Sequence, residues 1–264
     1  LNVQGRLSPS AGKNADGEDK FTVTLDHVTR LFREHDLDFM LLQEVGVREN
    51  EVHPKVKQAF GKGVTIIVNG VNDASDGGST GTLIVVNTSK AWQIEETWPH
   101  PTGRVVIVRV RRGTFRAKLF CAYMPPGLDQ SGPDSLTNAT RRAQAEVLYG
   151  YIKQHLAPDL VCILGGDLNE TRSNLDRASK PADGTLITNR LINGFIRGCP
   201  LMHDLLREAN PGKRVYTWAA ERAQGIALSR IDYVLAPAQW GDETLKWKTT
   251  TIKTGRVSDH DAVV

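Results

Sequence analysis

The sequence contains no apolar run close to the roughly 20 residues that a membrane helix needs, which excludes a membrane-spanning helix and makes a membrane partner unexpected. It also lacks a secretory signal, an internal repeat and a low-complexity segment. Charge of one sign is not in large excess, since 33 basic and 30 acidic residues leave a net charge of +3. With 264 residues, 40% of them hydrophobic, the chain is long enough to bury a substantial core.

Cysteine is scarce. The three cysteines, Cys121, Cys162 and Cys199, are an odd number without CxxC spacing. Two of them lie in apolar, strand-like runs. This pattern favours buried free thiols in a reducing compartment over a disulfide framework or a zinc site.

No shift in composition marks a linker, so the sequence predicts a single domain over residues 1–264. The chain begins with Leu1 rather than Met and stops at Val264 inside an apolar run. We therefore expect a domain excised from a longer polyprotein.

Basic residues are concentrated in one segment. Residues 104–118 carry six basic side chains and no acidic one, whereas residues 1–51 carry 10 acidic and 6 basic side chains. Such a basic ribbon can follow a phosphate backbone, which makes Arg109 and Arg111 candidate DNA-binding residues. The alternative is a solvated face of an amphipathic hairpin.

The apolar pattern predicts an α/β fold with mixed sheets. Apolar residues at helical spacing predict helices around 25–34, 147–156 and 187–196, with Val147 on the apolar face of the second. Short apolar runs predict strands at 38–44, 63–69, 81–87, 104–112, 115–123, 160–164, 216–218 and 231–235. Gly113-Thr114 predicts a tight turn between two of these strands.

Carboxylates and carboxamides stand at the ends of several predicted strands or close to them: Asn2, Glu44, Asp167, Asn169, Asp232 and Asp259, the last followed by His260. Strand ends converge at one edge of a sheet, where ligands commonly bind in α/β proteins. Asp167 and Asn169 are two residues apart, so on an extended strand their side chains point to the same side. Hard oxygen donors of this kind suit Mg²⁺, with Mn²⁺ as a substitute, and do not suit zinc.

Four motifs then occur in a fixed order: Gln43-Glu44, Gly166-Asp-Leu-Asn169, Ser229-Arg-Ile-Asp-Tyr233 and Ser258-Asp-His260. This succession resembles the endonuclease/exonuclease/phosphatase superfamily, the fold of DNase I and of the abasic-site endonucleases, over essentially the whole chain. The resemblance implies a DNase I-like four-layer α/β sandwich, with two packed mixed β-sheets flanked by helices.

The residues between the motifs resemble a narrower group. Four segments are similar to parts of the endonuclease domains of LINE-type non-LTR retrotransposons: Asn174-Leu-Asp-Arg177, Leu201-x-x-Asp204-Leu-Leu-Arg207, Asn210-Pro211 and Tyr216-Thr-Trp218. That likeness implies double-stranded DNA as substrate, a covalently linked reverse transcriptase domain and a nuclear location. The endonuclease would nick target DNA and leave a 3′ hydroxyl to prime reverse transcription.

The resemblance also implies roles for the residues at the metal side. Glu44 would be the main Mg²⁺ ligand with Asn2 nearby, and Asp259 would support the metal. Tyr123 would touch the scissile phosphate. Tyr123-Met-Pro125 is followed by Pro126, where many relatives have Asn, and this departure weakens the assignment of Tyr123.

The acid–base roles are implied in the same way. Asp167 would orient or deprotonate the attacking water, and Asn169 would hold the phosphate or that water. His260, oriented by Asp232, would donate to a non-bridging oxygen of the transition state.

The late motifs supply further candidates for DNA binding. Thr217, Ser229 and Arg230 lie beside them and would contact DNA phosphates. Sequence preference would come from the loops at residues 73–79, 127–138 and 219–228, and the last of these would be a loop or β-hairpin that enters the minor groove.

Three alternatives stay open. One is an abasic-site repair endonuclease. Another is a phosphoesterase for inositol phosphates or other small phosphoesters; against it, Ala227-Leu-Ser-Arg-Ile-Asp232 stands where inositol polyphosphate 5-phosphatases carry Pro-x-Trp-x-Asp-Arg. The third is a non-catalytic module on the same fold, which predicts the loss of an acidic or histidine position, yet all of those positions are filled.

Overall fold

The structure is a computed structural model that describes residues 1–8, 11–47, 52–70, 81–128, 135–180, 183–188, 190–222, 225–240, 243–244, 248–254 and 258–264. Its contacts divide the chain into two compact units. Unit 1 comprises Leu1–Tyr123 with Arg256–Ser258, and unit 2 comprises Met124–Gly255 with Asp259–Val264. Each unit is described by itself below, and the single domain expected over the whole chain stays a prediction.

Unit 1 contains two sets of antiparallel strands. β1 (Phe39–Gln43) and β2 (Val64–Asn69) pair with the two edges of β3 (Thr82–Asn87). β4 (Gln93–Pro99), β5 (Val105–Arg112) and β6 (Phe115–Tyr123) form the second set. The first sheet contacts β5 and β6, and the apolar side chains between the two sets form the core of the unit.

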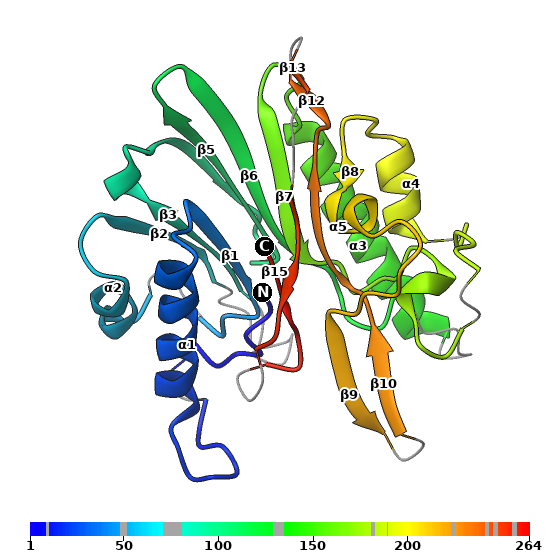
Figure 1. Ribbon diagram of the computed structural model, residues 1–264, viewed down its shortest axis with the longest axis horizontal. Coiled ribbons are helices and arrows are strands. Elements are labelled where there is room, and N and C mark those ends of the chain that lie inside the picture. The colour runs from blue at the N-terminus through cyan, green and yellow to red at the C-terminus, as the bar shows by residue number, and fades with distance from the viewer. Residues whose placement is uncertain are drawn as a thin grey trace. The chain divides into compact units, whose positions relative to one another are not determined.

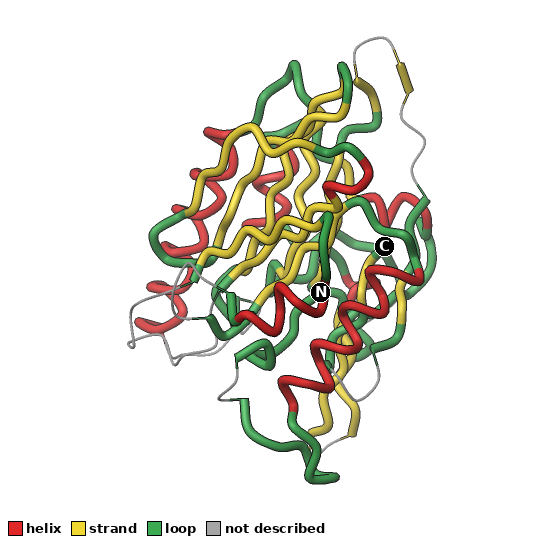
Figure 2. The backbone as a smooth tube through the Cα atoms, turned by 90° about the vertical axis from the view of Figure 1, so that its left-hand side faces the viewer, coloured by secondary structure: helices red, strands yellow, loops and turns green. Residues whose placement is uncertain are grey.

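The helices of unit 1 are amphipathic and short of Gly and Pro in their interiors. α1 (Lys20–Glu34) begins where the Asp19 carboxylate accepts a hydrogen bond from the Thr22 backbone N–H at 3.2 Å. It contacts α2 (Pro54–Phe60), where the rings of Phe32 and Phe60 meet edge to face. The 3₁₀ turn η2 (Thr88–Lys90) follows β3. Figures 1 and 2 show α1 and α2 beside the three-stranded sheet.

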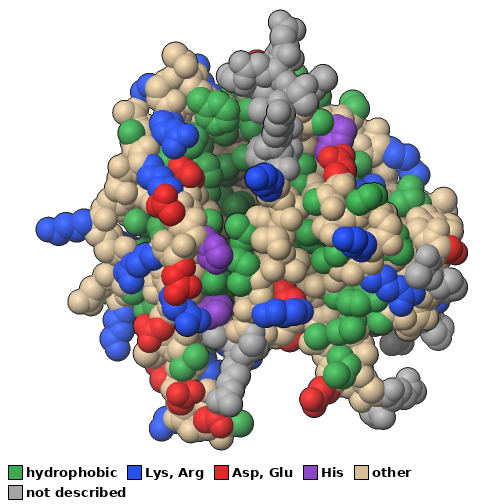
Figure 3. Space-filling model, viewed as in Figure 1, with side chains coloured by type: hydrophobic (Ala, Val, Ile, Leu, Met, Phe, Trp, Pro, Cys, Tyr) green, Lys and Arg blue, Asp and Glu red, His purple; other side chains and the backbone are tan. Residues whose placement is uncertain are grey.

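The hairpin expected from Gly113-Thr114 is confirmed. Arg112 and Phe115 are partners in the β5–β6 register, so these two residues alone connect the strands, and Gly113 has a φ of 60°. The charges beside it are not all basic, because β4 supplies Glu95 and Glu96 to the same surface. On the face drawn in Figure 3, acidic side chains lie among the basic ones.

Unit 2 is built around three antiparallel strands in the order β7 (Val161–Asp167), β11 (Asp232–Ala236) and β8 (His203–Asp204). A two-stranded hairpin, β9 (Trp218–Arg222) with β10 (Gly225–Ser229), precedes β11. The remaining elements are α3 (Ser135–His155), η3 (Asn174–Asp176), α4 (Leu191–Arg197), α5 (Leu205–Ala209), β12 (Gln239–Trp240), β13 (Glu243–Thr244), β14 (Thr251–Ile252) and β15 (Ala262–Val263).

Two further expectations can be compared with the structure. All three cysteines are free and buried, as predicted. Val147 is 62% exposed, so the prediction that it lies on the buried face of α3 was wrong. Leu148 and Ile152 fill that face, and Val147 is turned about 100° around the helix from Leu148. Among the residues that the structure describes, no helix is long and apolar enough to cross a membrane.

The N-terminus of unit 1 runs alongside β1. The Val3 N–H donates to the Gln43 carbonyl at 2.9 Å, and Asn2 pairs with Gln43 in the parallel sense. The chain can approach this closely because Gly46 has no side chain: a Cβ there would lie 2.6 Å from the Gly5 carbonyl oxygen. Gly46 thus allows the two segments that carry Asn2 and Glu44 to touch.

We predict that Gly46→Ala destabilises the chain more than Gly113→Ala does. Both glycines have positive φ, but the space around Gly113 is open, so the control retains only the backbone strain of about 1 kcal/mol. Gly46→Ala adds the clash with Gly5 and should cost about 2–4 kcal/mol. Urea unfolding followed by circular dichroism measures both, and equal losses would contradict this account of the contact.

Candidate active site

The register between β7 and β11 brings two predicted carboxylates together in unit 2. Asp167 is the last residue of β7, Asp232 is the first of β11, and the two are direct partners across the antiparallel pair. Both side chains are buried, with residue exposures of 1% and 4%. Partners across such a pair project to the same face, so the two carboxylates open toward one space.

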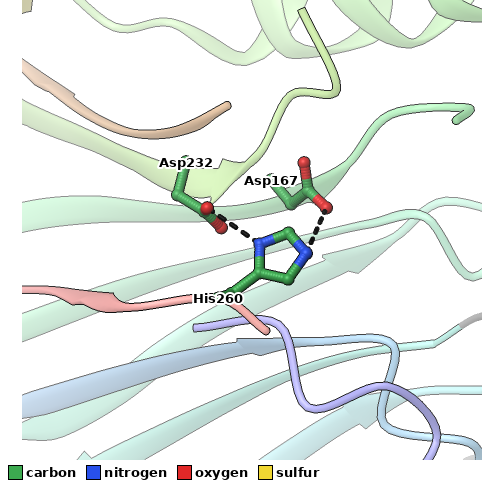
Figure 4. Close-up of side chains that lie close together, drawn as sticks. All are labelled: Asp167, Asp232 and His260. Atoms are coloured by element: carbon green, nitrogen blue, oxygen red, sulfur yellow. Dashed lines mark hydrogen bonds and ion pairs between the residues drawn. The ribbon is translucent and has the colours of Figure 1, made fainter. Parts of the chain in front are cut away.

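His260 lies between these carboxylates, as Figure 4 shows. Its Nδ1 is 2.8 Å from Asp232 Oδ2, and its Nε2 is 3.8 Å from Asp167 Oδ2. The second carboxylate oxygen of Asp232, Oδ1, is buried and has no hydrogen-bond partner among the described residues. The hydrogen bond from Nδ1 to Asp232 therefore orients the imidazole in the way that the sequence predicts.

The imidazole of His260 is held in its charged form. Burial lowers the pKa of His260, but the facing carboxylates of Asp232, Asp167 and Asp259 outweigh burial and raise it to about 9. Such a group is an imidazolium at neutral pH and can donate from Nε2 while Nδ1 stays on Asp232. The cluster thus combines a cationic donor with an unsatisfied carboxylate.

Asn169 and Asp259 complete the set in unit 2. The Asn169 backbone N–H donates to Asp167 Oδ1 at 2.9 Å, and its side-chain amide donates to the Met124 carbonyl at 2.9 Å. Asp259 accepts from the Trp218 indole N–H at 3.0 Å, and its other oxygen lies 3.5 Å from His260 Nε2. Asp259 therefore belongs to the surroundings of the imidazole within this unit.

Unit 1 holds the other predicted pair, Asn2 and Glu44. The Asn2 amide donates to Glu44 Oε1 at 3.0 Å, while the Asn2 carbonyl oxygen accepts from the Gln4 N–H. Glu44 directly follows β1 and has a φ of 51°, and Asn169 in unit 2 also has a φ of 51°. Left-handed backbone at a non-glycine residue is strained and often marks a functional position.

The donor chemistry of Asn2 and Glu44 fits a hard divalent cation, because it consists of carboxylate and amide oxygens. Asp167, Asp232 and His260 also offer ligand atoms within 4.8 Å of one another. His260 Nδ1 and Asp232 Oδ2 are hydrogen-bonded to each other at 2.8 Å, however, so these two atoms face one another and not a shared ion.

Tyr123 ends β6 and is 4% exposed. The Arg104 guanidinium lies over its ring, with the Arg104 Cζ 5.0 Å from the ring centroid. Arg104 is one of the six basic residues of the segment 104–118, which the sequence analysis treats as a basic ribbon. Its burial at 5% exposure sets it apart and places a cation beside the tyrosine.

Two of the predicted DNA contacts are wrong. Arg230 and Thr217 are both 0% exposed. The Arg230 guanidinium donates hydrogen bonds to the carboxylates of Asp176 and Asp204. The Thr217 hydroxyl accepts hydrogen bonds from the Ile231 and Asp232 N–H groups. Buried polar groups that are satisfied inside the protein cannot reach a DNA phosphate.

The remaining DNA-binding candidates lie at or near the surface. Ser229 is the last residue of β10 and is half-buried. Arg109 pairs with Glu95 and Glu96, and Arg111 pairs with Glu95. Their partners across the hairpin, Lys118 and Arg116, precede Tyr123 on β6 by about 17–23 Å of extended strand, so the ribbon and Tyr123 cannot contact one phosphate.

Sequence reasoning missed several buried polar residues around β11. Glu170 is fully buried, and its carboxylate accepts from the Leu191 and Ile192 N–H groups at the start of α4. Asp176 and Asp204 are buried against arginines. Glu170 follows Asp167-Leu-Asn169 directly, and Asp176 and Asp204 lie in the segments Asn174-Leu-Asp-Arg177 and Leu201-x-x-Asp204-Leu-Leu-Arg207, so the sequence drew attention to these positions without indicating that they are buried.

The chain belongs to the endonuclease/exonuclease/phosphatase family, whose model matches residues 1–260. The description of this family names endonucleases, exonucleases and phosphatases, which confirms the expectation of an enzyme. No curated protein matches the sequence.

Solved structures share the fold at low sequence identity. The AP endonuclease LMAP from Leishmania major has a TM-score of 0.70 and 17% identity, covering 99% of this chain and 84% of that one. An AP endonuclease from Archaeoglobus fulgidus has a TM-score of 0.68 and 19% identity, covering 92% and 93%. The endonuclease domain of TRAS1, a telomere-specific non-LTR retrotransposon, has a TM-score of 0.62 and 18% identity, covering 100% and 94%. The expected DNase I-like α/β fold is confirmed.

We predict that the chain loses stability between pH 6.5 and pH 9 through His260. The pKa of this residue is about 9 in the folded chain against 6.5 when unperturbed. A raised folded pKa stabilises fully below the unfolded pKa, and the contribution disappears as the pH rises through the folded one. The shift in the pKa of His260 corresponds to a loss of about 3 kcal/mol in the free energy of unfolding. Urea unfolding in EDTA from pH 6 to pH 10 measures it. Identical pH dependence in wild type and His260→Gln would contradict the assignment.

Proposed function

We propose that the chain is a Mg²⁺-dependent DNA endonuclease that nicks one strand of a duplex and leaves a 3′ hydroxyl. The buried Asp232–His260–Asp167 cluster carries this proposal. It supplies a carboxylate to accept a proton and an imidazolium to stabilise negative charge, which is what hydrolysis of a phosphodiester by water requires.

In the proposed reaction Asp167 accepts a proton from the attacking water, and the Asn169 side chain orients that water or the phosphate. The new P–O bond forms on the water oxygen, the P–O3′ bond breaks, and the departing 3′ oxygen takes up a proton from solvent. His260, with Asp232 on its Nδ1, donates a hydrogen bond from Nε2 to a non-bridging oxygen as charge develops there. The products are a 5′ phosphate and a 3′ hydroxyl.

The cation would be held by Glu44 and Asn2, with Asp259 in support. When bound, it would neutralise the phosphate and stabilise the leaving oxygen, and Mn²⁺ would be an adequate substitute. Tyr123, with the Arg104 guanidinium over its ring, would contact the phosphate. The electrostatic contribution of Arg104 is the feature that supports this role despite Pro126.

The biological role we propose is that of a non-LTR retrotransposon endonuclease, linked to a reverse transcriptase in a nuclear polyprotein. Two observations support this role. The segments Asn174-Leu-Asp-Arg177 and Tyr216-Thr-Trp218 resemble those of such endonucleases, and the fold is similar to that of the TRAS1 endonuclease domain. An abasic-site endonuclease is the second candidate, favoured by the likeness of fold to two AP endonucleases. Cleavage of abasic against intact duplex distinguishes the two.

The β9–β10 hairpin is the element that we propose for sequence preference. Its strands are paired from Trp218↔Ser229 to Arg222↔Gly225, and Ile226 is 67% exposed on it. An exposed apolar side chain on a projecting ribbon suits insertion into the minor groove. Of the other two loops expected to read DNA, residues 73–79 and residues 129–134 lie outside the described residues.

We predict that the purified chain nicks supercoiled plasmid in Mg²⁺ and not in EDTA. Asp167→Asn and Glu44→Gln should each lower the rate by about a hundredfold or more, since each removes a charge at the reaction. The exposed carboxylates Asp159 and Asp26, each changed to Asn, serve as matched controls in units 2 and 1 and should leave the rate within about twofold. An active Asp167→Asn variant would refute the proposed site.

We also predict that replacing residues 219–228 by a short Gly linker moves the positions of the nicks. The rate on random plasmid should stay within a few fold, because the hairpin reads DNA and takes no part in hydrolysis. Primer extension on nicked plasmid maps the positions. An unaltered pattern would show that the hairpin does not set preference.

A further inference from the structure

Unit 2 contains a buried ionic cluster that takes no part in the proposed hydrolysis. Arg230 is its centre and has the largest fully buried side chain among the described residues. Its Nε donates to Asp176 Oδ1 at 2.7 Å, and its two terminal nitrogens donate to the two oxygens of Asp204 at 2.9 Å each. The guanidinium thus binds the Asp176 carboxylate through Nε alone and the Asp204 carboxylate through both terminal nitrogens, as a bidentate pair, or fork.

The carboxylates of the cluster are held ionised. Burial raises the pKa of Asp176 and of Asp204, but the charge and hydrogen bonds of Arg230 outweigh it, and both values fall below normal. Arg207 adds a second cation beside Asp176, and Arg172 adds one beside Asp204. Asp176 Oδ2 also accepts from the Ser173 N–H at 2.9 Å, which fixes the turn.

The cluster joins the two segments that continue from the catalytic carboxylates. Arg230 stands two residues before Asp232 on the approach to β11, and Asp176 lies in η3, nine residues after Asp167. The Arg230 backbone N–H donates to the Asp176 carbonyl at 2.9 Å. Asp204 lies in β8, where it pairs with Leu235 of β11. Arg230 therefore joins two segments: it lies just before β11, and its guanidinium binds Asp176 in the segment that follows β7.

The aromatic neighbour reinforces the same junction. The Arg230 Cζ lies 4.5 Å from the centroid of the Tyr233 ring, and the Tyr233 hydroxyl donates to the Glu170 carbonyl at 2.8 Å. Glu170 directly follows Asn169 and holds the start of α4 with its carboxylate. Through Tyr233, Arg230 is thus connected to Glu170, the residue that directly follows the Asp167-Leu-Asn169 motif.

An ionic cluster is an unusual way to fill this space. A buried ion pair adds little net stability over a well-packed apolar core, but it is satisfied in one arrangement only. Directional bonds of this kind select a geometry where apolar packing tolerates several.

We propose that Arg230 is a positioning residue: gripped by Asp204 and Asp176, it sets where Asp232 stands against Asp167 and thereby how His260 is aimed. The inference rests on the proposed function for its catalytic consequence, but the alignment itself can be measured without any activity.

The test compares Arg230→Lys with Arg207→Met. Lysine keeps the charge but cannot form the fork, whereas Arg207→Met removes a cation from the outer side of Asp176 and leaves the fork intact. Misalignment of the reacting groups predicts that Arg230→Lys lowers kcat for plasmid nicking by about tenfold or more, with KM within about twofold. Arg207→Met should keep kcat within about threefold when both are assayed well below their unfolding temperatures.

The second readout is the proton resonance of His260 Nδ1–H in metal-free protein, identified by its loss in His260→Gln. We expect it to shift or broaden in Arg230→Lys and to stay in place in Arg207→Met. If Arg230→Lys does not fold, Asp204→Asn takes its place, since it weakens the fork from the other side. An unchanged resonance, with kcat falling only as stability falls, would overturn the proposal. An inactive wild type with a displaced resonance would refute the nuclease and leave the positioning role standing.

Discussion

The antiparallel pairing of β7 with β11 is the constraint on which the candidate site depends. It makes Asp167 and Asp232 direct partners, so both carboxylates project to the same face of the sheet. A slip by one residue would turn one of the two carboxylates to the opposite face of the sheet. His260 then completes the set because the segment after residue 258 joins unit 2, where the imidazole lies between the two carboxylates.

Charge is arranged differently in the parts of the molecule that the proposed reaction would use. In unit 2 a cationic imidazole is surrounded by carboxylates, and in unit 1 Glu44 is paired with an uncharged amide. The basic ribbon on β5 and β6 is partly neutralised, since Glu95 alone lies within 4 Å of three arginines. If the ribbon binds DNA as proposed, its attraction would therefore be weaker than the count of arginines in the sequence indicates, and it would act away from Tyr123.

Much of the fold and most of the site were readable from the sequence, because they depend on local patterns. The helical spacing of Leu25, Val28 and Leu31 and the turn at Gly113-Thr114 both produced the expected elements. The cluster residues were singled out by the resemblance of the four motifs to the superfamily, but their burial was not readable in the same way. Arg230 stands next to a polar Ser and reads as a surface cation. Its burial depends on Asp176 and Asp204, which lie 54 and 26 residues away in the chain. Pairing at that distance leaves no local periodic signal.

The account rests on cleavage of the P–O3′ bond by water, and the chemistry at the nick tests this most directly. Plasmid nicked in Mg²⁺ would be offered to a DNA polymerase with labelled nucleotides, with and without prior phosphatase treatment. We expect direct extension from the nicks without phosphatase, because the leaving oxygen becomes a free 3′ hydroxyl. Extension only after phosphatase treatment would reveal a 3′ phosphate and contradict the proposed mechanism.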